Sequence, residues 1–151
     1  MEILVVYGSQ YGNTQRIARA IAGALEADHR VRVTQAATAT ELRGEAVDLL
    51  FVGAPTQMRG LRLLAKPFLD GLARQGFAGV PAAAFDTRME LGPQLLESTV
   101  IGDELAAAGC RLIAKPQSFV VLGLEGPLAD GEEARAATWA RAVVRRVTAP
   151  G

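Results

Sequence analysis

Short apolar runs alternate along the chain with stretches in which apolar residues recur at helical spacing. The first run, residues 3–6, is continuously apolar, as expected for a strand buried on both faces of a parallel sheet. Apolar positions then recur every three or four residues from Ile17 to Leu25, which is typical of an amphipathic helix. The pattern therefore predicts a strand followed, after a short turn, by a helix.

Four further strands are predicted by the same reasoning. Residues 31–33 alternate in polarity, which indicates a more exposed strand, and residues 47–52 and 80–85 form buried runs. The run at 80–85 is expected to end at Asp86. A fifth strand is expected to begin at residues 111–114, to break at Pro116 and to resume at residues 119–122.

Three further helices are predicted between and after these strands. Pro67 suits the first turn of a helix that carries Phe68, Leu69 and Leu72, and residues 94–108 show a second helical pattern. The last helix follows a capping-box pattern at residues 130–133, with Asp130 three positions before Glu133. Trp139 lies on the apolar stripe of that helix, which predicts a core residue.

The predicted order βαββαβαβα describes five strands joined by short connections. Right-handed crossovers turn this order into an α/β fold, a doubly wound three-layer sandwich with a five-stranded parallel sheet and helices on both faces. We expect residues 1–151 to form a single domain. Ligands of such sheets bind beyond the carboxyl ends of the strands. The loops at residues 8–14, 54–66 and 86–93 are therefore the candidate binding loops.

Composition narrows the function classes. Half of the 151 residues are hydrophobic, and 16 acidic residues balance 16 basic ones, which gives no electrostatic reason to expect nucleic acid or a membrane as partner. Cys110 is the one cysteine and His29 the one histidine, so we predict neither a disulfide nor a metal site, and no catalytic residue stands out. No run is long enough for a signal peptide or a membrane span, which predicts a cytoplasmic location.

The turn after the first strand has the composition of a phosphate site. Gly8 and Gly12 allow a sharp turn that brings backbone N–H groups close to a ligand, while Ser9, Asn13 and Thr14 add short polar side chains. The following helix directs the positive end of its dipole to the same place. In the simpler alternative, Asn13 or Thr14 only caps the helix. The spacing excludes a nucleoside-triphosphate P-loop and a dinucleotide-binding turn.

The sequence Tyr-Gly-Ser-x-x-Gly-Asn-Thr at residues 7–14 resembles the phosphate-binding loop of the flavodoxins. In that family the residues corresponding to Ser9, Tyr11, Asn13 and Thr14 hold the phosphate of FMN without arginine or lysine. The resemblance covers the whole chain, is to the short-chain type, and implies FMN as cofactor. The segments 85–88, 119–121 and 125–128 also resemble a bacterial group within the family.

Taken together, the three loops give the predicted cofactor-binding residues. These residues are Ser9, Gln10, Tyr11, Gly12, Asn13, Thr14, Pro55, Thr56, Gln57, Met58, Gly60, Asp86, Thr87 and Arg88.

The second and third loops depart from the flavodoxin pattern. Flavodoxins stack aromatic side chains from these loops on the flavin ring, whereas neither loop here contains an aromatic residue. Met58 and Met89 are the candidate substitutes for them, and Thr56 and Gln57 the candidate partners of the polar edge of the ring.

The charge departs from the pattern as well. Flavodoxins are strongly acidic, whereas this chain is neutral and its predicted mouth carries Arg59, Arg62 and Arg88. Two interpretations of these arginines stay open. They either form a solvated rim, with Arg88 paired to Asp86 or Glu90, or meet an anionic ligand or an acidic partner.

Two functions remain open at this point. The first is an FMN-binding redox protein, an electron carrier or a small flavin reductase, that serves a redox partner protein or a small-molecule electron acceptor. The second is a degenerate flavodoxin-fold module that holds no flavin and binds another phosphorylated ligand or a protein. A phosphoacceptor receiver domain is set aside, because Tyr7-Gly8-Ser9 stands where paired acidic residues are required.

Overall fold

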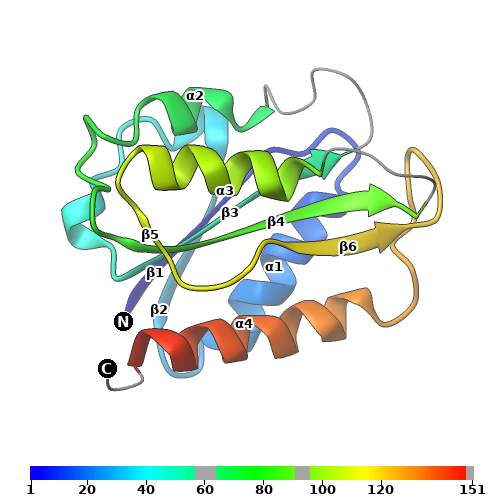
Figure 1. The fold of residues 1–151 in the computed structure, drawn as a ribbon. Coiled ribbons are helices and arrows are strands. Elements are labelled where there is room, and N and C mark those ends of the chain that lie inside the picture. The colour runs from blue at the N-terminus through cyan, green and yellow to red at the C-terminus, as the bar shows by residue number, and fades with distance from the viewer. Residues whose placement is uncertain (57–63, 91–95, 149–151) are drawn as a thin grey trace.

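The computed structural model describes residues 1–56, 64–90 and 96–148 (Figure 1). Strands and helices alternate in it as the sequence predicts. In chain order the elements are β1 (Glu2–Tyr7), α1 (Asn13–Leu25), β2 (Arg30–Gln35), two 3₁₀ turns, β3 (Leu49–Thr56), α2 (Lys66–Asp70), β4 (Pro81–Met89), α3 (Glu97–Ala107), β5 (Arg111–Leu112), β6 (Gln117–Val121) and α4 (Glu132–Thr148). None of the helices in the described ranges combines the length and the hydrophobicity needed to cross a lipid bilayer.

All strands form one parallel sheet in the order β2-β1-β3-β4-β5, and β6 also pairs with β4. β5 pairs with the start of β4 at Pro81 and Ala82, whereas β6 pairs with its end, from Phe85 to Met89. The fifth position of the sheet is thus occupied by two strands with Pro116 between them. This arrangement confirms the predicted fold class and the predicted break in the fifth strand.

Two of the boundaries that differ from the prediction affect the candidate site, because β3 and β4 both extend into segments expected to be loops. Their ends pair in register, with Ala54 opposite Asp86, Pro55 opposite Thr87 and Thr56 opposite Arg88. Pro55 is tolerated because its missing N–H lies on the side of β3 that faces β1, and β1 has already ended at Tyr7. Asp86 does not end β4, and Asp86, Thr87 and Arg88 are strand residues.

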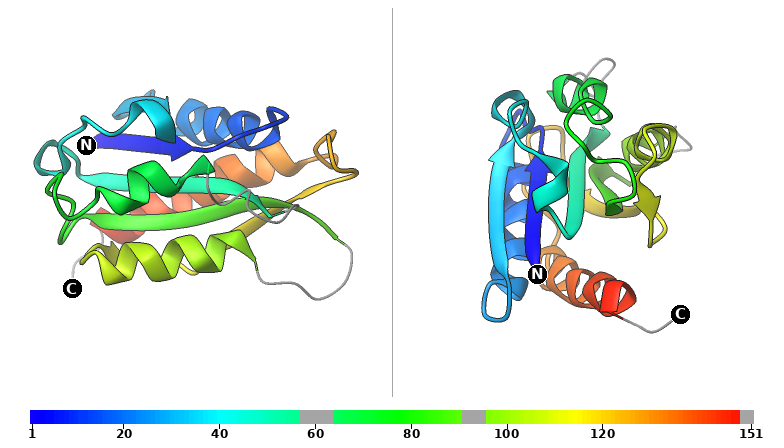
Figure 2. Two further views of the ribbon diagram at one scale, coloured as in Figure 1. Left: turned by 90° about the horizontal axis from the view of Figure 1, so that it is seen from above. Right: turned by 90° about the vertical axis from the view of Figure 1, so that its left-hand side faces the viewer.

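Alternation along the central strands divides the apolar side chains between two cores. The side of the sheet that α2 and α3 cover contains Leu50, Val52 and Ala84, packed with Phe68 and Ile101. The opposite side, which α1 and α4 cover, contains Phe51, Phe85 and Phe119. The two helix layers are seen on either side of the sheet in Figure 2. Side chains at the ends of β3 and β4 therefore point alternately toward α3 and toward α1.

Trp139 of α4 anchors the second core, as its place on the apolar stripe predicts. Its ring lies edge-on to three phenylalanines, with centroids 5.5 Å from Phe51, 5.9 Å from Phe119 and 6.2 Å from Phe85. The ring is thereby committed to packing between α4 and the sheet. Trp139 does not line the pocket at the candidate loops.

Candidate functional site

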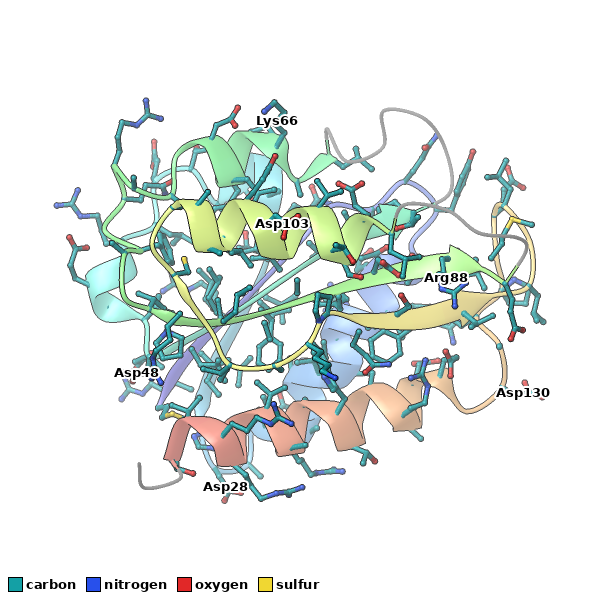
Figure 3. All side chains as sticks on the ribbon, in the orientation of Figure 1. Asp28, Asp48, Lys66, Arg88, Asp103 and Asp130 are labelled. Atoms are coloured by element: carbon teal, nitrogen blue, oxygen red, sulfur yellow. The ribbon has the colours of Figure 1, made fainter. Side chains whose placement is uncertain are left out.

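A small pocket lies at the carboxyl ends of the central strands, where the loops after β1 and β6 meet at the right-hand end of the molecule in Figure 1. Every residue that lines it belongs to the predicted site: Ser9, Gln10, Tyr11, Asn13, Thr14, Pro55 and Thr87. Figure 3 shows Arg88 and Asp130 at this end, and Asp28 and Asp48 at the opposite one. The fold thus brings the first predicted loop together with one residue each from β3 and β4.

The two glycines of the first loop are needed for different reasons. Gly12 has φ +89°, a left-handed conformation that favours glycine, and a Cβ there would meet nothing within 4 Å. Gly8 instead allows close approach, because its Cβ would lie 2.5 Å from the Cβ of Leu64 and 2.8 Å from the Leu64 carbonyl carbon. The N–H of Gly8 continues the β1–β3 pairing by donating to the Gly53 carbonyl at 2.9 Å.

A backbone hydrogen bond fixes the donor and acceptor roles of the Ser9 hydroxyl. Its oxygen accepts the N–H of Gly12 at 3.0 Å. A hydroxyl carries one proton and can accept two hydrogen bonds, so this contact leaves the Ser9 proton available for donation. Among the described residues no acceptor takes that proton. Ser9 is therefore a hydrogen-bond donor at the pocket wall.

The helix-capping explanation of Asn13 and Thr14 is wrong. The residue at the N-cap of α1 is Gly12, and no side chain caps this helix end. Asn13 and Thr14 are buried and use their side chains elsewhere: the Asn13 amide donates to the Glu125 carbonyl at 3.2 Å, and the Thr14 hydroxyl pairs with that of Thr87 at 2.8 Å. Their backbone N–H groups, in the first turn of α1, have no intrahelical acceptor and remain available to a ligand.

The loop between β6 and α4 packs against the start of α1 beside the pocket, a contact that sequence reasoning missed. Besides the Asn13–Glu125 hydrogen bond, Gly126 lies so close to Asn13 that a Cβ would come within 2.7 Å of its Oδ1. The two contacting segments are 112 residues apart in the sequence. The resemblance of residues 125–128 to a bacterial group is the one signal in the sequence, and it indicates no contact.

The Thr56 and Asp86 side chains face the other side of the sheet and accept hydrogen bonds from the start of helix α3. The Thr56 hydroxyl accepts the N–H of Glu97, and Asp86 Oδ2 accepts the N–H of Ser98 at 2.9 Å. Asp86 is fully buried, and within the described ranges its Oδ1 has no hydrogen-bond partner. These two side chains cap a helix whose own N-cap residue, Leu96, has no capping side chain. The structure therefore separates them from the pocket that holds Thr87.

The remaining predicted residues divide into two groups. Gln57, Met58 and Gly60, together with Arg59 and Arg62, lie outside the described residues. Arg88 is half-buried and donates through Nη1 to the Met89 carbonyl at 3.4 Å, and in the described part of the chain it forms no ion pair with Asp86 or Glu90. The Met89 side chain packs against the core beneath α1 and α4.

The pocket lining suits an anion that is recognised by hydrogen bonds. None of its seven residues carries a charged side chain, and they include Ser9, Thr14 and the first residue of α1, where the free N–H groups of a helix begin. No cluster of histidine, cysteine or carboxylate side chains suited to a metal ion occurs within the described residues. The open space at Gly12 leaves room for a group at the helix end. These features fit a terminal phosphate.

Comparisons with known proteins identify the family and the fold. A family model described as flavodoxin matches residues 5–139. The fold is similar to that of oxidised flavodoxin 2 from Bacillus cereus, with a TM-score of 0.79 and 26% identity over 97% of this chain and 99% of that one. No curated protein sequence matches the chain significantly.

Two further solved structures share the fold at lower identity. A flavodoxin from the domain Archaea has a TM-score of 0.76 and 20% identity over 98% of this chain and 99% of that one. A short-chain flavodoxin associated with a bacterial microcompartment has a TM-score of 0.76 and 18% identity over 97% and 99%. The family match spans most of the chain and includes residues 9–14, so the protein is a member of the flavodoxin family.

Proposed function

We propose that this protein binds FMN by its phosphate in the loop at residues 9–14 and carries electrons with it. The observation that carries the proposal is the uncharged pocket that Ser9, Thr14 and the first residue of α1 line together. Phosphate monoesters are held at such sites by several donors together with the positive end of the helix dipole. Membership of the flavodoxin family supports FMN over other phosphorylated ligands.

Each part of the chain has a separate task in this proposal. Ser9, Thr14 and the backbone of residues 10–14 hold the phosphate, while Pro55 and Thr87 close the pocket from β3 and β4. Gln57, Met58 and Gly60 are proposed to border the flavin ring. Bound FMN would supply the redox chemistry, in one-electron or two-electron steps, and the protein would position the ring and shield it from water. The proposed electron acceptor is a redox partner protein or a small molecule.

The test is the colour and flavin content of the purified protein. We expect a yellow protein that releases FMN on denaturation, or a colourless one that quenches the fluorescence of added FMN as it binds. Ser9→Asp should weaken FMN binding by about a hundredfold or more, because it places a carboxylate beside the phosphate. Thr138→Asp, at an exposed position of α4, is the matched control and should bind FMN normally.

Two results would contradict the proposal. A wild-type protein that neither contains nor binds FMN would favour the degenerate module, and inorganic phosphate or another phosphorylated compound would then be the next ligand to titrate. Unchanged FMN affinity in Ser9→Asp would place the phosphate somewhere other than this loop.

A further inference from the structure

Two buried hydroxyl groups meet behind the pocket. Thr14 Oγ1, in the first turn of α1, lies 2.8 Å from Thr87 Oγ1, near the end of β4. Thr14 is 1% exposed and Thr87 is fully buried, so water does not reach the pair freely. Both residues nevertheless line the pocket. The contact joins segments 73 residues apart and fixes the start of α1 against the sheet.

The Thr14 and Thr87 hydroxyls together carry one more proton than their mutual hydrogen bond requires. Each hydroxyl carries one proton, and a single proton suffices for the bond between the two oxygens. Among the described residues neither oxygen has a second hydrogen bond. One of the two hydroxyls therefore keeps a proton that has no acceptor in the described part of the chain, and buried donors without acceptors are rare in native structures. An acceptor in the pocket would satisfy it.

We infer that Thr87 is a positioning residue that donates its proton to Thr14 and so directs the Thr14 proton to the bound phosphate. With Thr87 as donor, Thr14 Oγ1 is occupied as an acceptor, and its own hydrogen points into the pocket. Ser9 has the same arrangement, because its oxygen accepts the Gly12 N–H and its own proton remains available for donation. The Ser9 and Thr14 hydroxyls are thereby both oriented as donors toward the phosphate, which only accepts hydrogen bonds. The inference rests on the proposed function.

The experiment compares two flavins that differ only in the phosphate. FMN and riboflavin are titrated by fluorescence quenching into wild type, Thr87→Val, Thr87→Ser, Thr14→Val and the double valine variant. Valine keeps the shape of threonine and removes the hydroxyl, whereas serine restores it. Thr34→Val is the matched control, because Thr34 and Thr38 form a similar hydroxyl pair, 2.9 Å apart, at an exposed position. Melting temperatures show whether each variant folds.

We expect Thr87→Val to weaken FMN binding about tenfold, with riboflavin binding unchanged and Thr87→Ser close to wild type. Because Thr87 acts through Thr14, the double variant should bind FMN about as weakly as Thr14→Val alone. Thr34→Val should have no effect on either flavin.

Three results would overturn the inference while wild type binds FMN. The first is unchanged FMN affinity in Thr87→Val, and the second is an equal loss of FMN and riboflavin affinity. Additive losses in the double variant would also overturn it, because Thr87 would then contact the phosphate independently. Failure of wild type to bind FMN would overturn the proposed function, and this inference with it.

Discussion

The absence of a side chain at Gly126 allows the loop after β6 to pack closely against the start of α1. The φ of this glycine is +107°, and a Cβ at this position would lie 2.7 Å from Asn13 Oδ1, so alanine would displace the Asn13 side chain. We predict that Gly126→Ala lowers the free energy of unfolding by about 2–4 kcal/mol, through backbone strain and steric overlap together. It should also weaken FMN binding, because Asn13 begins the helix whose first N–H groups are proposed to bind the phosphate. Urea unfolding and FMN titration measure the two effects.

The control for this prediction is Gly131→Ala. Gly131 also has a left-handed φ, +82°, but a Cβ there meets nothing within 4 Å. Its replacement should cost about 1–2 kcal/mol from the backbone alone and leave FMN binding unchanged. Equal effects of the two substitutions on FMN binding would show that the contact with Asn13 is unimportant for the pocket.

At the scale of elements, the outer edge of β6 is covered by the start of α4. The Glu132 carboxylate accepts the N–H of Val120 at 2.6 Å, and Arg135 donates to the Ser118 carbonyl at 2.6 Å. Arg135 also bonds both carboxylate oxygens of Glu132, at 2.8 and 2.7 Å, and lies over the Phe119 ring. These contacts satisfy backbone groups that an exposed edge strand would offer to another chain.

Glu132 should make stability depend on pH. The hydrogen bond from Arg135 holds the pKa of the Glu132 carboxyl below its ordinary value of 4.5, against the opposing effect of burial. Its contribution is therefore complete above the unfolded pKa and is lost as pH falls through the lower folded value. We predict that Glu132→Gln costs about 1–3 kcal/mol at pH 7 and that the difference from wild type shrinks below pH 4.5. Urea unfolding from pH 7 to pH 3 measures this.

Glu133→Gln is the matched control on the same helix turn. Glu133 pairs with Arg16, and the side chains are 48% and 54% exposed. Exposed pairs contribute little, so this change should cost less than about 1 kcal/mol at any pH. A loss in Glu132→Gln that stays the same at pH 7 and pH 3 would refute the role of the charge.

The boundaries of the elements mark the limit of sequence reasoning at this scale. Apolar periodicity predicts the strands and helices, but it places the end of a strand at Asp86, because aspartate favours turns. In the structure Asp86 continues β4, where the N–H of Ser98 satisfies one of its oxygens. Similarly, the capping-box pattern assigns Glu133 to its own helix end, whereas its side chain bonds Arg16, from another helix. A local pattern contains no information about such partners.

For the whole molecule, the same limit applies to the site. The first loop is recognisable from adjacent residues, because a phosphate turn is a local structure. Thr87 of β4 completes the pocket lining, and the loop after β6 packs against Asn13, through Thr14–Thr87 and Asn13–Glu125 contacts that span 73 and 112 residues. The sequence points to Thr87 as a site residue but not to its partner, and it does not predict the contacts of Asn13 with Glu125 and Gly126. Packing of the complete chain creates both.

Because the pocket is assembled from distant segments, ligand binding should stabilise all of them together. A ligand at a hundred times its dissociation constant stabilises the folded state by about 2.7 kcal/mol and slows exchange through global unfolding about a hundredfold. We predict that FMN slows amide hydrogen exchange most in residues 9–16, 86–89 and 120–128, and less at residues 26–30, at the opposite end of the sheet. The measurement is exchange by mass spectrometry with and without FMN, with Ser9→Asp as control. Protection confined to residues 9–16 would mean that the first loop binds the phosphate without coupling to β4 and to the loop after β6, and the pocket would then be less cooperative than its contacts indicate.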